Sequence, residues 1–264
     1  MYNFNYHQAK SVDDASKLAS GTEEGKLMAG GMTLLPTLKQ RLAKPSDLID
    51  LGKIPELKGI KKDGNNIVIG AMTRHYDVAN SDVVKSAIPG LAGLAAHIGD
   101  PAVRNRGTIG GSIANNDPAA DYPSAVVALG ATVITNKRKI AGDDFFKGLF
   151  ETALEPGEVV TAVSFPIPEK SAYMKFPNPA SRYAIVGVYV AKTGGNVRVG
   201  VTGAGAVVFR QKDMEAALAK SFTPDAIKNI QQKQDGLNSD IHASAEYRAH
   251  LVNVMARRAV AACG

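Results

Sequence analysis

The chain has 264 residues and a net charge of +6, and 45% of its residues are hydrophobic and 21% charged. This is the composition of a globular protein; its apolar runs are too short to cross a bilayer and its N-terminus does not resemble a signal peptide, so we expect a cytoplasmic chain without a membrane span. The single cysteine excludes an internal disulfide or a cysteine-bound iron–sulfur cluster, and basic residues scattered through a chain without tryptophan argue against nucleic-acid binding.

The first part of the chain, residues 1–55, predicts a small βαβ-like unit. Ser11 has the position of a helix N-cap, and a strand pattern runs directly into Gly30-Gly31. Leucines at helical spacing after this doublet indicate an amphipathic helix. The expected elements are a helix at 15–20, a strand at 26–29, a helix at 33–41 and a strand at 46–51.

Residues 56–168 predict a larger mixed α/β unit. Its expected elements are a strand at 66–69, helices at 77–84 and 91–98, a helix-to-strand passage at 126–135 and a strand at 158–165. Between them lies Pro101–Asp121, which is rich in glycine, asparagine and aspartate. This composition predicts a long loop, and loops of such length in compact domains are usually functional.

A change of pattern near residue 168 predicts a domain boundary, so we expect a first domain at 1–168 and a C-terminal domain at 169–264. Strands expected at 184–192 and 196–202 meet at Gly194-Gly195, a hairpin signal. Helices are expected at 211–220, from Thr223 onward and at 243–262. The predicted fold class is α+β, with a two-part first domain followed by a small antiparallel sheet and helices.

Two glycine doublets carry the strongest chemical signal. Gly30-Gly31 is followed within two residues by Thr33, and Gly110-Gly111 is followed by Ser112. Glycine permits positive φ and close approach of a ligand to the backbone, so successive N–H groups are able to converge on an anion, and a hydroxyl adds a donor. Two such loops suit a dinucleotide pyrophosphate, although a single doublet is more often a simple turn. Neither doublet matches the G-x-G-x-x-G fingerprint.

The residues around the doublets resemble a known family. The segment from Met28 to Leu51 is similar to the first FAD loop of the flavoprotein (medium) subunits of molybdenum hydroxylases, such as carbon monoxide dehydrogenase, and of the FAD domain of xanthine dehydrogenases. The segment from Ile98 to Ser124 resembles their second FAD loop more closely. Both motifs stand in the family order, and the similarity extends over nearly the whole chain.

The resemblance implies that the first domain binds FAD without a covalent bond, with the pyrophosphate between the two glycine loops. It implies a hydrogen bond from Asp121 to sugar or ribityl hydroxyls, and a position for Ile98 near the isoalloxazine ring. Met32 departs from the family, which often has a polar residue there. The implied cofactor contacts are Lys26, Leu27, Met28, Ala29, Gly30, Gly31, Met32, Thr33, Ile98, Thr108, Ile109, Gly110, Gly111, Ser112, Asn115, Asp117, Asp121, Val160 and Lys175.

Without the family, several of these residues have ordinary interpretations. Asp121 would cap the helix that follows it, Ile98 and Val160 would be core residues, and Lys175 would be a surface charge. Tyr183 is either a shield for one flavin face or a core tyrosine. None of the five histidines has metal-ligand spacing, so no metal site and no catalytic base are predicted.

The implied function is electron transfer. The family's molybdenum cofactor and [2Fe-2S] clusters lie on a large and a small partner subunit, commonly assembled as a dimer of heterotrimers, and FAD passes the electrons to an external acceptor. Two alternatives stay open at this point. The chain could be a stand-alone flavoprotein oxidase or dehydrogenase, which would require a base over the flavin, or a scaffold protein that has lost its flavin.

Overall fold

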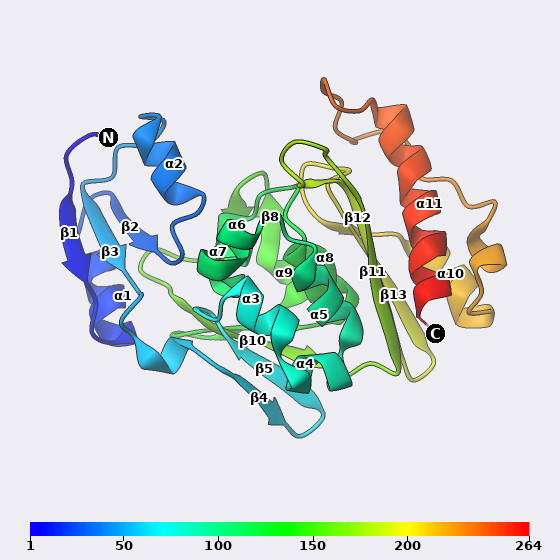
Figure 1. The fold of residues 1–264 in the computed structure, drawn as a ribbon, viewed down its shortest axis with the longest axis horizontal. Coiled ribbons are helices and arrows are strands. Elements are labelled where there is room, and N and C mark those ends of the chain that lie inside the picture. Colours follow the sequence, from blue (N-terminus) through cyan, green and yellow to red (C-terminus); the bar gives the residue numbers. More distant parts are fainter. Residues whose placement is uncertain (264) are drawn as a thin grey trace.

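A computed structural model describes residues 1–263, and it contains three sheet-based units that follow one another along the chain (Figure 1). The N-terminal unit lies at one end of the molecule, the C-terminal helix at the other, and the middle unit between them. No helix within these residues is both long and apolar enough to cross a membrane.

The N-terminal unit is a three-stranded parallel sheet in the order β1-β3-β2, with two helices. Ser11 caps the first helix, because its side chain accepts a hydrogen bond from the backbone N–H of Asp14. The predicted βαβ arrangement is therefore confirmed, and β1 adds a strand that was not expected. The elements are β1 (Asn5–Gln8), α1 (Val12–Ser20), β2 (Gly25–Met28), α2 (Leu34–Lys39) and β3 (Asp47–Asp50).

The middle unit is a five-stranded antiparallel sheet in the order β4-β5-β10-β6-β7, with helices packed on it. Its strands are β4 (Ile60–Asp63), β5 (Asn66–Gly70), β6 (Thr132–Thr135), β7 (Lys139–Ala141) and β10 (Val160–Pro166). Its helices are η1 (Pro55–Leu57), α3 (His75–Asn80), α4 (Asp82–Ala87), α5 (Pro89–Ala96), α6 (Pro101–Arg106), α7 (Ile109–Asn115), α8 (Tyr122–Ala128) and α9 (Gly142–Phe145), and a small ribbon is formed by β8 (Phe146–Gly148) and β9 (Glu151–Thr152).

Two predictions for the middle unit were wrong. The single helix expected at 77–84 is two helices, since Ser81 leaves the helical conformation and caps the second one. The loop expected over Pro101–Asp121 is mostly helical, because Asp100 caps α6 and Thr108 caps α7. Glycine and asparagine lower helix propensity, but these caps and the packing of α7 on the sheet outweigh it.

The C-terminal unit is a four-stranded antiparallel sheet in the order β11-β12-β13-β14, covered by a long helix. The predicted hairpin is present as β12 and β13, whereas β11, which pairs with β12 along its length, was not expected. The elements are β11 (Lys170–Pro177), β12 (Ala184–Thr193), β13 (Asn196–Thr202), β14 (Phe209–Arg210), α10 (Lys212–Lys220), η2 (Pro224–Ile227) and α11 (Ala245–Ala262).

The cores of the middle and C-terminal units are joined. Tyr173 and Tyr189, both from the C-terminal sheet, belong to the same buried apolar cluster as the helices of the middle unit. Their rings stack at a centroid separation of 6.3 Å. The C-terminal sheet therefore packs directly against α5 and α8 of the middle unit, and α8 in turn contacts α7, the helix that carries the second glycine doublet.

Candidate cofactor site

The first glycine loop presents a row of unpaired backbone donors. Strand β2 ends at Met28, and Gly31 then takes a φ of +74°, a conformation that favours glycine. Thr33 precedes α2 but its side chain makes no capping bond. Within residues 1–263, none of the N–H groups of residues 29–34 donates a hydrogen bond to a protein acceptor. Such a run of free donors suits the oxygens of an anion.

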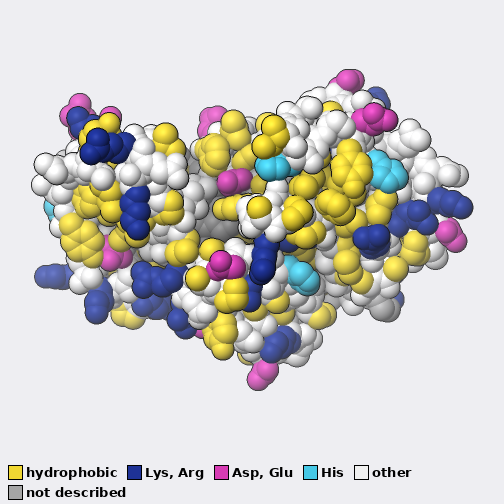
Figure 2. Space-filling view, turned by 45° about the horizontal axis from the view of Figure 1, so that its top comes forward, with side chains coloured by type: hydrophobic (Ala, Val, Ile, Leu, Met, Phe, Trp, Pro, Cys, Tyr) yellow, Lys and Arg dark blue, Asp and Glu magenta, His cyan; other side chains and the backbone are white. Residues whose placement is uncertain are grey.

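The two glycine loops, far apart in the sequence, touch each other. A methyl group on Gly30 would lie 2.1 Å from the carbonyl oxygen of Arg106, so the loop passes directly against the turn between α6 and α7. A methyl group on Gly111 would lie 3.1 Å from the Cβ of Ala29. Figure 2 shows the surface hollowed between the N-terminal lobe and the middle of the molecule.

The second doublet has a different role from the first. The N–H groups of Ile109 and Gly110 donate to the carbonyls of Thr73 (3.1 Å) and Ala71 (2.9 Å), and that of Gly111 donates to the Thr108 hydroxyl (3.2 Å). These N–H groups already donate to acceptors within the protein, so they are not free to bind a ligand. The expectation of converging free N–H groups therefore applies to the first doublet, while the second lets α7 pack closely against the sheet and the first loop.

Asp121 lies in a buried ionic cluster. Its carboxylate accepts a hydrogen bond from the Tyr173 hydroxyl (2.5 Å) and pairs with the ammonium of Lys175 (3.0 Å). The side chains of Asp121 and Lys175 are only 5% and 4% exposed. Lys175 also donates to the carbonyl of His97 (2.9 Å). Burial raises the pKa of the Asp121 carboxyl, and Lys175 and Tyr173 oppose that rise.

The ordinary interpretations of these two residues were wrong. Asp121 makes no capping bond to α8, because its carboxylate is turned toward Tyr173 and Lys175 instead. Lys175 is not a surface charge, since it lies on β11 facing the middle unit. Both side chains thus lie inside the molecule, where a paired charge is costly to unpair.

The other acidic and aromatic candidates border the same region. Asp117 is half-buried, which raises the pKa of its carboxyl, and it accepts a bond from the N–H of Ala119 (2.8 Å). Tyr183 is 43% exposed and so is not a core tyrosine; partial desolvation and the neighbouring Asp117 raise its pKa, and its hydroxyl lies beside Thr33 of the first loop. Tyr183 therefore approaches the first loop from the C-terminal unit. Asn115 is half-buried at the end of α7.

Ile98 and Val160 occupy apolar positions. Ile98 is half-buried against the middle core, and its carbonyl accepts a bond from the Arg104 guanidinium (2.6 Å). Arg104 thus organises the start of this segment. Val160 is 6% exposed and belongs to the core, and Lys26 is exposed on β2.

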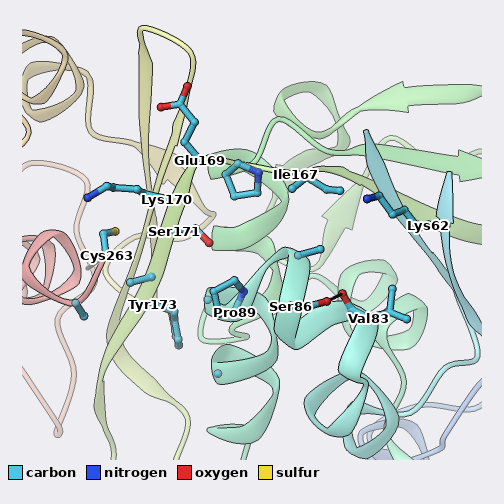
Figure 3. A pocket seen from close by; sticks show the side chains of 16 residues that line it. Lys62, Val83, Ser86, Pro89, Ile167, Glu169, Lys170, Ser171, Tyr173 and Cys263 are labelled. Carbon is cyan, nitrogen blue, oxygen red and sulfur yellow. Dashed lines mark hydrogen bonds between the residues drawn. The ribbon is translucent and has the colours of Figure 1, made fainter. Parts of the chain in front are cut away.

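The described part of the chain contains at least two cavities. One of about 600 Å³ is lined by Gly30, Thr108, Arg74 and Arg106, among others, so it opens at the contact between the glycine loops. The other, of about 950 Å³, lies between α4, α5 and residues 167–173 (Figure 3). It contains no residue predicted to bind cofactor, but Tyr173 lies in its wall.

Sequence reasoning missed Tyr173, although the residue contacts Asp121 directly. Tyr173 and Lys175 are two positions apart on one strand, so both face the middle unit. If β11 had been predicted, the alternation of side chains along a strand would have placed Tyr173 on the same face as Lys175.

The described residues fit a flavin dinucleotide. The free N–H groups of residues 29–34 match a pyrophosphate, and the buried carboxylate of Asp121 and the ammonium of Lys175 match hydroxyl and carbonyl groups of the flavin half. Tyr183 links the two regions, because its hydroxyl lies beside Thr33 of the first loop and its ring is near Asp117 and Asp121.

Comparisons with known proteins agree with this geometry. A family model described as the FAD binding domain in molybdopterin dehydrogenase matches residues 2–168. A second, the CO dehydrogenase flavoprotein C-terminal domain, matches residues 171–263.

Relatives of known name align along the whole chain. The chain is 36% identical to the glyceraldehyde dehydrogenase medium chain of Sulfolobus acidocaldarius, with 97% of this chain and 96% of that protein covered. It is 35% identical to the carbon monoxide dehydrogenase medium chain of Hydrogenophaga pseudoflava, over 97% and 96% of the two chains. A similar structure, of reconstituted CO dehydrogenase from Oligotropha carboxidovorans, has a TM-score of 0.89 at 33% identity and covers 99% of this chain and 97% of that one.

Proposed function

Because this chain belongs to the FAD-binding medium subunits of the molybdenum hydroxylases, we propose that it holds FAD between its two glycine loops and passes electrons through it to an external acceptor. The observation that carries this proposal is the row of free N–H groups at residues 29–34, which lies directly against the turn before α7. We also propose residues 1–168 and 169–264 as the two domains, since the two family models meet there.

The residues of this chain bind and orient the cofactor. The N–H groups of residues 29–34 hold the pyrophosphate, and the Ser112 hydroxyl borders it from the second loop. The Asp121 carboxylate accepts hydrogen bonds from cofactor hydroxyls, and Lys175 places a fixed positive charge beside it. FAD supplies the redox step by accepting and releasing two electrons.

No residue of this chain is assigned to substrate oxidation. We propose that this step takes place on a large subunit with a molybdenum cofactor, and that a small subunit with [2Fe-2S] clusters delivers the electrons, with two such heterotrimers paired. Relatives at nearly equal identity are named for glyceraldehyde, nicotine and carbon monoxide. This spread supports placing substrate choice on a partner subunit.

The absorption spectrum of the natively purified chain, with its copurifying subunits separated on a denaturing gel, tests the proposal. We expect flavin bands that denaturation releases, together with a large and a small partner that carry molybdenum and iron. Flavin on a lone chain that turns over a substrate would instead support an independent oxidase, and failure to bind FAD on reconstitution would overturn FAD binding.

The variant Gly30→Ala tests whether FAD binding needs the close contact between the two glycine loops. Its methyl group would lie 2.1 Å from the Arg106 carbonyl oxygen and force the two loops apart, so we expect FAD affinity to fall at least tenfold. Gly195→Ala is the control, because a methyl group there, at the hairpin tip, meets nothing within 4 Å. Equal FAD affinity of both variants would place the cofactor elsewhere.

A further inference from the structure

The segment before α8, residues 118–121, is hydrogen-bonded to the C-terminal unit. The Thr202 hydroxyl, at the end of β13, lies 3.0 Å from the carbonyl oxygen of Pro118 and 2.7 Å from that of Ala120. The backbone N–H of Gly203 also donates to the Pro118 carbonyl at 2.7 Å. One strand end therefore fixes two carbonyls of this segment.

The neighbouring residues of the segment are held in the same way. The N–H of Ala184, at the start of β12, donates to the Ala119 carbonyl at 3.3 Å. The Tyr173 hydroxyl and the Lys175 ammonium hold the side chain of Asp121. Each residue from 118 to 121 thus has a hydrogen bond or ion pair to the C-terminal sheet, and the segment has little freedom to rotate Asp121.

The contact between the two units leaves no room for adjustment. Within the C-terminal unit, a methyl group on Gly203, where φ is +81°, would lie 2.5 Å from the Ala184 carbonyl oxygen, so the ends of β12 and β13 that hold the segment are themselves closely packed. A methyl group on Gly200 would lie 2.3 Å from the carbonyl oxygen of Ser124, in α8. The strand ends and the site segment are therefore in direct backbone contact, so a change in one is transmitted to the other.

We propose that Thr202 and Tyr173 are positioning residues that set the orientation of Asp121 toward the flavin, so that the C-terminal sheet completes a site whose glycine loops lie entirely in the first domain. This inference rests on the proposed FAD binding. The hydrogen bonds that carry it run from Thr202 and Tyr173 to the 118–121 segment, and each residue acts on the site through that segment.

The Thr202 hydroxyl is not needed for the strand itself. Thr202 is 1% exposed, and its hydroxyl, with one proton to donate, lies between the Pro118 and Ala120 carbonyls of the 118–121 segment and makes no hydrogen bond to the sheet. Valine has nearly the same shape and an equal or higher strand propensity, so Thr202→Val preserves the strand and removes only the donor. The Ala120 carbonyl would then be buried without that partner.

FAD titration of the natively purified protein, after removal and return of the flavin, tests Thr202. We expect Thr202→Val to weaken FAD binding about tenfold and to shift the midpoint potential of the bound flavin, because losing a buried partner has an effect of this size. Thr202→Ser keeps the hydroxyl and is expected to restore both. Thr193→Val, at the exposed tip of the same hairpin, is the control.

Tyr173→Phe provides a second, independent variant. It removes the hydroxyl bonded to Asp121, and we expect weaker FAD binding and altered visible flavin bands. Tyr189→Phe is its matched control, because the stacked Tyr189 bonds Ser171 instead of the segment.

The outcomes separate this inference from the proposed function. If the unaltered protein fails to bind FAD, the proposed function fails and the inference fails with it. If the unaltered protein binds FAD, but Thr202→Val and Tyr173→Phe match it in affinity, potential and spectrum, only the positioning role is overturned. A lower unfolding midpoint with unchanged flavin properties also overturns the positioning role, because it shows that these residues act on stability alone.

Discussion

Single residues in this protein show how far local sequence signals reach. Ser11 has the position of a helix cap and acts as one, because a cap depends on residues three positions away, whereas Thr108 caps α7 in a segment whose composition predicted a loop. Asp121 also stands before a helix, but its partners, Tyr173 and Lys175, come from a strand about fifty residues later. Only the family resemblance pointed to the importance of Asp121 and Lys175, and nothing local pointed to Tyr173.

His75 illustrates a buried group with an effect on stability. It is 5% exposed, its Nδ1 has no partner among residues 1–263, and its ring lies 5.3 Å from that of Tyr122. Burial, with a smaller contribution from Arg104, lowers the pKa of His75 from 6.5 to about 4. The folded protein therefore keeps His75 neutral where the unfolded chain would protonate it.

This difference predicts acid destabilisation. Below pH 6.5 the unfolded chain binds a proton that the folded protein excludes until about pH 4, so the free energy of unfolding falls over this range, by on the order of 3 kcal/mol. In His75→Leu, which has no titrating group at this position, we expect the free energy of unfolding to change less with pH over this range. Urea unfolding between pH 7.5 and 4.5 measures it, with His242→Gln, at an exposed site, as the control. An unchanged slope in His75→Leu would contradict the assignment.

At the scale of elements, strands with clear apolar alternation and helices with caps were predictable, and most appear within a few residues of the expected bounds. The exceptions have physical causes. Residues 101–106 and 109–115 are helical because two caps and tertiary packing overcome a glycine-rich composition. Strand β1 at Asn5–Gln8 has no apolar alternation, and it exists because it pairs in parallel with β3.

Strand β10 is tied to the β6–β7 hairpin by Glu158. Its carboxylate is fully buried and accepts bonds from Arg138 (3.0 Å), Thr135 (2.7 Å) and the N–H of Glu155 (2.9 Å). Burial alone would raise the pKa of Glu158, but these donors outweigh it and lower the pKa to about 2. A depressed carboxyl pKa stabilises the fold above the unfolded value of 4.5, and this contribution is lost as the pH falls toward 2.

Glu158→Gln is therefore expected to destabilise the protein by roughly 3 kcal/mol at pH 7, and the difference from the unaltered protein should shrink as the pH falls below 4.5. Denaturant unfolding at a series of pH values measures both effects. Glu23→Gln, at an exposed position, serves as the control. A loss of stability that is constant from pH 7 to pH 3 would show that shape, and not charge, explains the effect.

At the scale of the whole molecule, the candidate site draws on all three units. The first glycine loop belongs to the N-terminal sheet, the second lies on a helix of the middle unit, and Tyr173 and Lys175 come from the C-terminal sheet. No unit taken alone contains the site. This arrangement explains why sequence patterns identified the loops separately but gave no indication of how they meet, since their contact is set by packing between units.

A ligand bound at such a site links the stability of the three units. FAD that binds only the folded protein adds RT ln(1 + [FAD]/Kd) to the free energy of unfolding, about 2.7 kcal/mol at a hundredfold excess over Kd. We expect FAD to raise the midpoint of a single cooperative unfolding transition. Far-UV circular dichroism measures this transition, because the chain has no tryptophan to report it by fluorescence. Gly30→Ala, which we expect to bind FAD at least tenfold more weakly, should reduce this increase to about 1.4 kcal/mol or less at the same FAD concentration. If FAD raised the midpoint of one transition and left a second unchanged, one unit would lie outside the site, and the C-terminal sheet would have no part in holding the flavin.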